Sequence, residues 1–119
     1  MINSWGGRRF EFEPSSAALV VVDMQRDFLD PDGVAAVEGE PVDVLRRVMP
    51  AVSAVTKAAR VAEIRVIHTR EGYAPDLSDV SDMKAARGSV GTTGPLGRFL
   101  IRSEPGHDFS DGFEPEGDE

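Results

Sequence analysis

The stretch AALVVVDMQRDFLDPDG, Ala17–Gly33, decides the fold class of this sequence. Residues 17–24 form a short, valine-rich run without polar alternation, which is typical of a strand buried on both faces of a parallel sheet. This run leads into a carboxylate, Asp23, and the stretch closes with DPDG at 30–33, whose proline and glycine favour a tight turn. We therefore expect a buried strand that delivers a carboxylate to a loop.

The residues that follow predict a helix and a second strand. Apolar residues recur at helical spacing over Val42–Ala62, and Pro50 is expected to start or kink this helix. The next run, EIRVIHTR at Glu63–Arg70, is β-branched and ends in polar residues. Because strand, helix and strand in this order form a parallel crossover, the sequence predicts an α/β fold with a mainly parallel sheet.

Beyond Arg70 the periodic pattern stops. Glycine and proline punctuate about thirty residues, which predicts a long loop, with RFLIR at 98–102 as a candidate strand fragment. The last six residues are too polar to pack a core. Two parallel strands buried on both faces need further strands and a second helical layer, so the predicted unit is incomplete.

Length and charge restrict the classes of function. The 119 residues are enough for one domain, and 13 basic against 21 acidic residues give a formal charge of -8. This charge repels phosphate backbones and anionic membranes, which argues against nucleic acid and membrane partners. No cysteine is present, so this chain supplies no disulfide, thiolate ligand or cysteine nucleophile. Without a signal-like or membrane-spanning run, a cytoplasmic location is the expectation.

The polar residues at the two strand ends are the candidates for chemistry. Ligands bind at the carboxyl ends of strands in open parallel sheets, where a desolvated carboxylate such as Asp23 is a candidate general base. The alternative is that Asp23 caps the turn through backbone N–H groups. Arg70 and Glu71 bind substrate or pair with each other, and the pair is the favoured interpretation.

The remaining candidates are aromatic residues and histidines. Phe28 and Tyr73 line a pocket or anchor the loop. His68 and His107 are the only histidines, too few to indicate a metal cluster. For His68 we expect packing or hydrogen bonding, and for His107 a position at the surface.

Three blocks resemble one known family. ALVVVDMQRDF (18–28), VIHTREGYAPDLSD (66–79) and GPLGRFLIRSEPGHDF (94–109) are similar to the isochorismatase-like cysteine hydrolases, particularly the biuret amidohydrolase branch. The resemblance implies part of a Rossmann-like three-layer α/β/α sandwich, with residues 1–119 as its amino-terminal half. It also implies a hydrolase that needs no cofactor and cleaves a carbon–nitrogen bond of a small amide, imide or ureido compound.

The resemblance also implies roles for individual residues. Asp23 matches the general base of an Asp, Lys and Cys triad, which takes the proton of a thiol that attacks the carbonyl. Phe28 matches a pocket wall, and His68–Tyr73, which includes Arg70 and Glu71, lies where the family builds one side of the site. Gln25 matches a motif glutamine with a structural hydrogen-bonding role.

Two triad members have no counterpart in this sequence. In relatives the lysine and the cysteine come later than the segments matched here, and neither Lys57 in the predicted helix nor Lys84 in the loop is at the family position. We therefore expect a second polypeptide to supply both residues in a hetero-oligomer. The alternatives are a non-catalytic binding or regulatory subunit and a truncated or decayed homologue.

Overall fold

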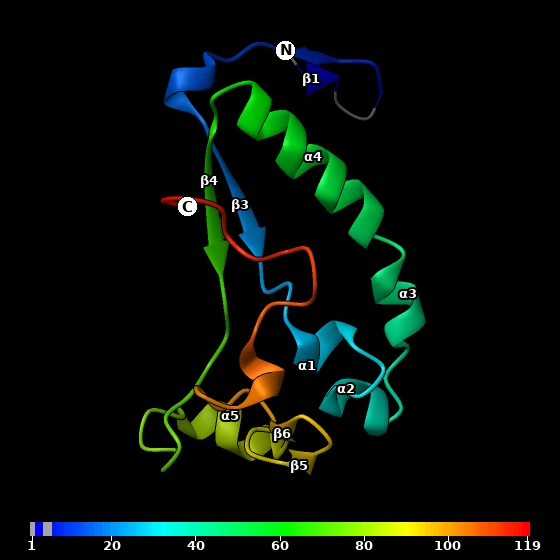
Figure 1. Ribbon diagram of the computed structural model, residues 1–119, viewed down its shortest axis with the longest axis vertical. Coiled ribbons are helices and arrows are strands. Elements are labelled where there is room, and N and C mark those ends of the chain that lie inside the picture. Colours follow the sequence, from blue (N-terminus) through cyan, green and yellow to red (C-terminus); the bar gives the residue numbers. More distant parts are fainter. Residues whose placement is uncertain (1, 4–5) are drawn as a thin grey trace.

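The computed structural model describes residues 2–3 and 6–119. The body is elongated, with a two-stranded sheet and its longest helix toward one end and short helices and loops at the other (Figure 1). In chain order the elements are β1 (Ile2–Asn3), β2 (Arg9–Phe10), the 3₁₀ turn η1 (Pro14–Ser16), β3 (Ala18–Val22), α1 (Arg26–Leu29), α2 (Val34–Val37), α3 (Val42–Arg46), α4 (Met49–Val61), β4 (Arg65–Thr69), α5 (Asp82–Arg87), β5 (Thr93–Gly94), β6 (Gly97–Arg98) and the 3₁₀ turn η2 (Pro105–His107).

The two predicted strands, β3 and β4, pair in parallel, as the sequence indicates. Their register runs from Ala18 opposite Arg65 to Val22 opposite Thr69. Both strands point toward the loop end of the molecule, so their carboxyl ends open on the same side (Figure 1). The parallel α/β arrangement is thus confirmed, and polar residues that follow the two strands are brought to one edge of the sheet.

The predicted helix over 42–62 is two helices, α3 and α4, and Pro50 lies in the first turn of the second. Proline has no backbone N–H to donate and is tolerated at a helix start, which explains why the chain begins a new helix there. In the described part of the chain, no helix is long and apolar enough to cross a membrane.

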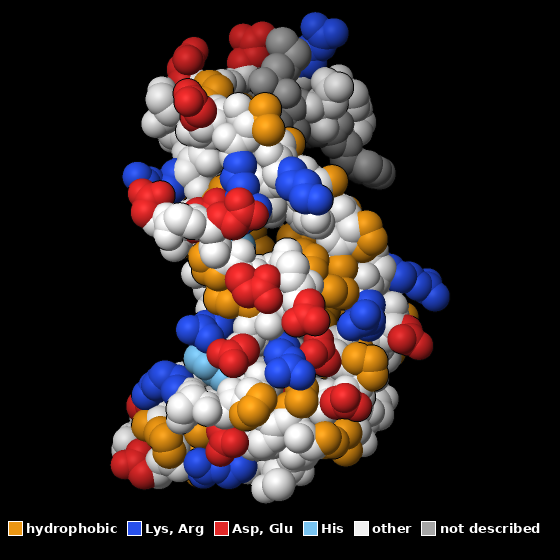
Figure 2. Space-filling view, viewed as in Figure 1, with side chains coloured by type: hydrophobic (Ala, Val, Ile, Leu, Met, Phe, Trp, Pro, Cys, Tyr) orange, Lys and Arg blue, Asp and Glu red, His pale blue; other side chains and the backbone are white. Residues whose placement is uncertain are grey.

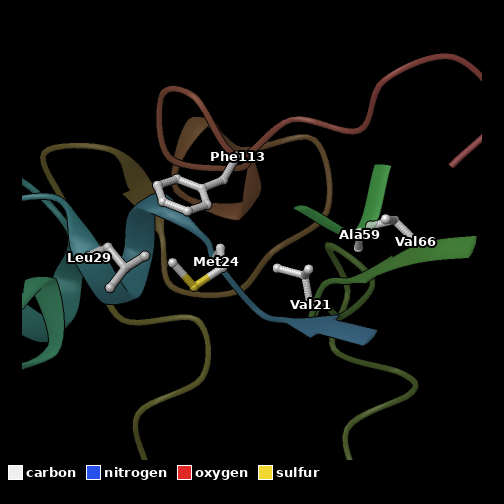
Figure 3. Close-up of a cluster of buried hydrophobic side chains, with 6 residues drawn as sticks. All are labelled: Val21, Met24, Leu29, Ala59, Val66 and Phe113. Carbon is white, nitrogen blue, oxygen red and sulfur yellow. The ribbon is translucent and has the colours of Figure 1, made fainter. Parts of the chain in front are cut away.

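The core lies where α4 and the carboxyl-terminal segment meet one face of the sheet. Six buried side chains form it, from β3, the β3 exit, α1, α4, β4 and the tail: Val21, Met24, Leu29, Ala59, Val66 and Phe113 (Figure 3). A smaller cluster of Val34, Phe99 and Leu100 holds the loop end, and Phe28 packs against both clusters. The core therefore joins the sheet to the loops on one side only.

The segment after Arg70 is more regular than its sequence suggests. It contains α5, whose first turn is capped by the Ser81 hydroxyl accepting from the Lys84 amide at 3.3 Å, and whose end is marked by Gly88 at φ +78°. The candidate strand at 98–102 is only partly extended, with Ile101 bridging to Tyr73. The long loop is thus a folded unit.

Candidate active site

Asp23 follows β3 directly and has an unusual backbone conformation. Its φ of +53° lies in the left-handed region, which is costly for a residue with a Cβ. Its amide donates to the Thr69 carbonyl at 3.1 Å, and its own carbonyl accepts from the Gln25 amide at 2.8 Å. The chain turns sharply here because both neighbouring hydrogen bonds hold it in place, and such strain is characteristic of functional positions.

The Asp23 carboxylate is held by one side chain. Oδ1 accepts from the Thr69 hydroxyl at 2.7 Å, so the interpretation of Asp23 as a cap on backbone N–H groups is wrong for this oxygen. Within the described residues no donor bonds to the second oxygen, Oδ2. An apolar groove along β3 reaches Val22 and Met24, on either side of Asp23, without being lined by the aspartate itself. The half-buried carboxylate thus has one oxygen anchored and one unengaged.

Gln25 ties the β3 exit to two distant segments. Its side chain is fully buried, and Nε2 donates to the carbonyls of Glu71 at 2.9 Å and His107 at 3.0 Å. Its Oε1 accepts from the Glu71 amide at 2.7 Å. All the hydrogen-bonding groups of this amide except one oxygen lone pair are therefore used, which confirms the predicted structural role.

Asp27 is a second buried polar anchor. Its Oδ2 accepts from the amide of Leu100, a buried residue at φ +57°, at 2.8 Å. Burial raises the pKa of Asp27, although the backbone amides of Leu100 and Val34 oppose the change. A Cβ added to Gly106 would lie 2.2 Å from Oδ1, so the chain needs glycine there to pass over the carboxylate. Asp27 thus holds α1 against the segments that contain Leu100 and Gly106.

Glu71 and Tyr73 are brought together, as expected for two residues of one wall. The Tyr73 hydroxyl donates to Glu71 Oε1 at 2.7 Å, and Lys84 of α5 contacts the same oxygen at 2.6 Å. Burial opposes the charge on Glu71, but the bonds from Lys84 and Tyr73 outweigh it and lower the pKa of Glu71. Burial and the bond to Glu71 raise the pKa of Tyr73 to about 12, so its proton stays on the phenol.

Arg70 turns away from this pair. It bonds to Asp108 at 3.2 Å, and its guanidinium lies 4.9 Å from the centre of the Phe109 ring. The favoured interpretation of an Arg70–Glu71 pair is therefore wrong. The physical reason is that adjacent residues leaving a strand point to opposite sides, so each meets a different segment.

Phe28 and the two histidines occupy packed positions. Phe28 is half-buried and packs edge-on against Phe99, with ring centres 5.7 Å apart. His68 contacts Glu119 through Nε2 at 3.1 Å, in agreement with the expected hydrogen bond. His107 is buried rather than at the surface, because Gly72 lets the chain pass against its ring. Burial and the nearby Arg70 lower the pKa of His107.

Three residues that contribute to the site were not assigned a role from sequence. Thr69 binds Asp23, Lys84 binds Glu71, and Asp27 supports the loops. Thr69 carries a usable signal, because pairing the two predicted strands in parallel puts their polar exits side by side. No pattern in the sequence around Lys84 indicates its role, because its partner, Glu71, lies in another segment.

The comparisons with known proteins agree with this geometry. The model of the isochorismatase domain matches residues 17–119. A crystal structure of a cysteine hydrolase from Pseudomonas syringae pv. phaseolicola 1448A is similar to this chain, with 26% sequence identity and a TM-score of 0.71. The match covers 92% of this chain but 46% of that hydrolase, so this chain spans about half its length. With a parallel Rossmann-type α/β arrangement and this family match, the chain belongs to the isochorismatase family.

Proposed function

We propose that this chain is the amino-terminal half of a cysteine-dependent amidohydrolase that cleaves a carbon–nitrogen bond of a small amide, imide or ureido compound. Asp23 is its general base, and a second polypeptide supplies the lysine and the nucleophilic cysteine in a cytoplasmic hetero-oligomer. Biuret and related ureido compounds are the first substrates to test, since the sequence blocks resemble that branch of the family.

The observation that carries the proposal is the state of the Asp23 carboxylate. It lies at the carboxyl end of a parallel strand, in a strained backbone conformation, with Oδ1 bonded to Thr69 and Oδ2 without a described donor. A general base needs a fixed direction and an oxygen that can take a proton. This arrangement meets both needs.

The chemistry is an acyl transfer in two stages. The Asp23 carboxylate takes the thiol proton, the sulfur bonds to the carbonyl carbon, and the carbon–nitrogen bond breaks as the leaving nitrogen takes the proton back. Water then attacks the thioester, which restores the thiol and releases the acid. The partner's lysine balances the charge of Asp23, and backbone amides beside the cysteine stabilise the oxyanion.

We assign the substrate pocket to residues near the two strand ends. Glu71 offers a carboxylate acceptor for amide or ureido N–H groups, oriented by Tyr73 and Lys84 at its Oε1. Phe28 forms an apolar wall of this pocket, whereas Arg70 meets Asp108 and Phe109 on the other side of the chain and would have to leave them to reach the substrate. The proposed pocket thus recognises the N–H side of an amide or ureido group.

A second polypeptide is proposed because the sheet is open on its other face. Val20, Val22 and Ile67 point away from α4 and are 49%, 61% and 41% exposed. Burying one such side chain fully is worth about 1.5–3 kcal/mol. An uncovered parallel sheet is therefore a strong candidate for an interface with further α/β structure.

The free edge of β3 supports the same partner. Two neighbouring grooves, of about 440 and 710 Å³, run along it between the sheet and α4, and neither is lined by a charged residue. Leu19 and Val55 line both, and Figure 2 has hydrophobic side chains gathered over this region. An apolar strand added to β3 would satisfy the edge and fill the grooves, as expected for the half of a hydrolase domain absent from these 119 residues.

The test is to purify the native assembly, measure intact masses, and assay ammonia release from biuret and from small ureido and amide compounds. We expect a cysteine-containing partner of comparable size and a loss of at least about 1,000-fold in kcat for Asp23→Asn. Asp32→Asn, an exposed aspartate in the DPDG turn, is the matched control and should keep full activity.

Two results would overturn the proposal. Hydrolysis by the purified 119-residue chain alone would show that no partner thiol is needed. Unchanged turnover of Asp23→Asn in the intact assembly would support a binding or regulatory subunit instead.

A further inference from the structure

We infer that Thr69 is a positioning residue for Asp23, with its hydroxyl holding the carboxylate in the orientation that accepts the thiol proton. The inference rests on the proposed function and adds a residue to it. It follows from the way the two strand ends meet.

Thr69 contacts Asp23 in two independent ways. As the last residue of β4 it lies opposite Val22, and its carbonyl accepts from the Asp23 amide at 3.1 Å. Its hydroxyl donates to Asp23 Oδ1 at 2.7 Å. Any residue at position 69 can make the backbone contact, but among small side chains only threonine and serine can make the second.

The hydroxyl bond fixes the orientation of the Asp23 side chain, which the backbone leaves free. The φ of +53° at Asp23 sets where the side chain leaves the chain, while rotation about its χ angles stays open. The bond to Oδ1 removes that freedom and leaves Oδ2 for the incoming thiol. Thr69 thus keeps the base oriented.

The absence of cysteine from this chain makes a direct measurement possible. In the native assembly, every thiol that iodoacetamide alkylates lies outside these 119 residues, with the sulfur bonding to carbon as iodide leaves. The alkylation rate follows the fraction of thiolate, which the general base maintains. Measuring this rate against pH therefore reports on the base without a known substrate.

The experiment compares Thr69→Val with Thr69→Ser. For Thr69→Val we expect alkylation about tenfold slower at neutral pH and the acidic limb of its pH profile moved about one unit upward, because the thiol keeps its proton to higher pH when the carboxylate that takes it is no longer held in place. Thr69→Ser keeps the hydroxyl and should stay within about twofold of wild type. Thr93→Val, the same substitution at an exposed site on β5, is the control.

A purely structural role would give a different result. If Thr69 only joins the strands, Thr69→Val lowers stability but leaves the pH profile in place. Protection of the Asp23 amide from hydrogen exchange, which depends on the backbone bond, should be unchanged in both variants and shows that the sheet is intact.

Two outcomes separate this inference from the proposed function. If Asp23→Asn does not slow alkylation, the proposed general base is wrong and the role of Thr69 falls with it. If Asp23→Asn slows it strongly while Thr69→Val keeps the wild-type rate and profile, only the positioning role is wrong. The double variant should be no slower than Asp23→Asn, because Thr69 acts through Asp23.

Discussion

The loop end of the molecule and its sheet end differ in how completely the chain covers its own residues. The loop end, formed by α1, α2, α5 and η2, holds the most deeply buried side chains, among them Gln25, Asp27 and Ile101. The sheet end, formed by β3, β4 and α4, leaves Val20 and Val22 exposed although they belong to the most hydrophobic run. The loop end thus buries its own side chains, whereas the sheet end leaves apolar side chains exposed.

This difference shows that hydrophobicity in the sequence does not by itself predict burial in one chain. The loop end is closed by polar side chains that use their hydrogen bonds within the chain, as Gln25 does. Valine side chains form no hydrogen bonds, so a valine-rich strand is covered only when another layer of structure packs against it. The loop end therefore covers its own apolar residues, and the exposed sheet end is the surface at which we propose that the partner binds.

The largest loss of stability is expected when the buried polar contacts of the loop end are removed. Gln25→Ala removes the three hydrogen bonds of a fully buried side chain and leaves the Glu71 amide and the carbonyls of Glu71 and His107 without this partner. We expect a loss of about 3 kcal/mol or more in the free energy of unfolding, measured by urea denaturation. Arg26→Ala is the control.

The control tests the next residue, which is the first of α1. Arg26 makes a partly exposed pair with Asp30, the residue that follows α1, so its loss should cost no more than about 1 kcal/mol. Equal losses for the two variants would contradict the view that buried polar contacts, rather than surface pairs, close the loop end.

The sequence predicts the sheet end well because its signals are local. The β-branched runs predicted β3 and β4, the end of the first run predicted the position of Asp23, and Pro50 predicted a start or kink of the helix between them. Each of these features depends on residues a few positions apart. The apolar period continues across the break between α3 and α4, so only Pro50 indicated a helix start or kink there.

The loop end could not be predicted in the same way. Gln25 and Asp27 contact residues 46 to 82 positions away, and no local pattern indicates which segments meet. The burial of His107 depends on the glycine at 72, on a different segment. The same holds for the Asp23–Thr69 bond, where Asp23 was predicted as a candidate base from its strand but its partner required the register of β3 and β4.

A smaller effect is expected where the tail crosses back to the sheet end. Arg60 of α4 bonds to both carboxylate oxygens of Glu119 at 2.7 Å and to Glu116 at 2.7 Å. The bond to Arg60 is the main cause that lowers the pKa of Glu119 to about 2. Because the folded-state pKa is below the ordinary glutamate value of about 4.3, this stabilisation is present above that pH and lost as pH falls toward 2.

Arg60→Ala should therefore cost about 1 kcal/mol at neutral pH and flatten the fall of stability between about pH 4.5 and 2. Thermal denaturation over this range measures both effects. Arg47→Ala, an exposed arginine between α3 and α4, should leave the curve unchanged. A fall as steep in Arg60→Ala as in wild type would mean that the tail is not held by this pair.

The smallest effect is expected for a substitution of Val22, on the open face of the sheet. Val21 and Val22 are neighbours on β3, but Val21 is 5% exposed against α4 and Val22 points to the open face. Valine to threonine keeps the shape and adds a hydroxyl, so Val21→Thr should cost about 1–2 kcal/mol in the isolated chain. Val22→Thr should stay within about 0.5 kcal/mol, because water already reaches this side chain.

In the native assembly the two variants should lose similar amounts of stability, because the layer of the proposed partner would bury Val22 as well. A persistent difference there, measured by denaturation of the purified complex, would mean that the open face of β3 is not where the partner binds.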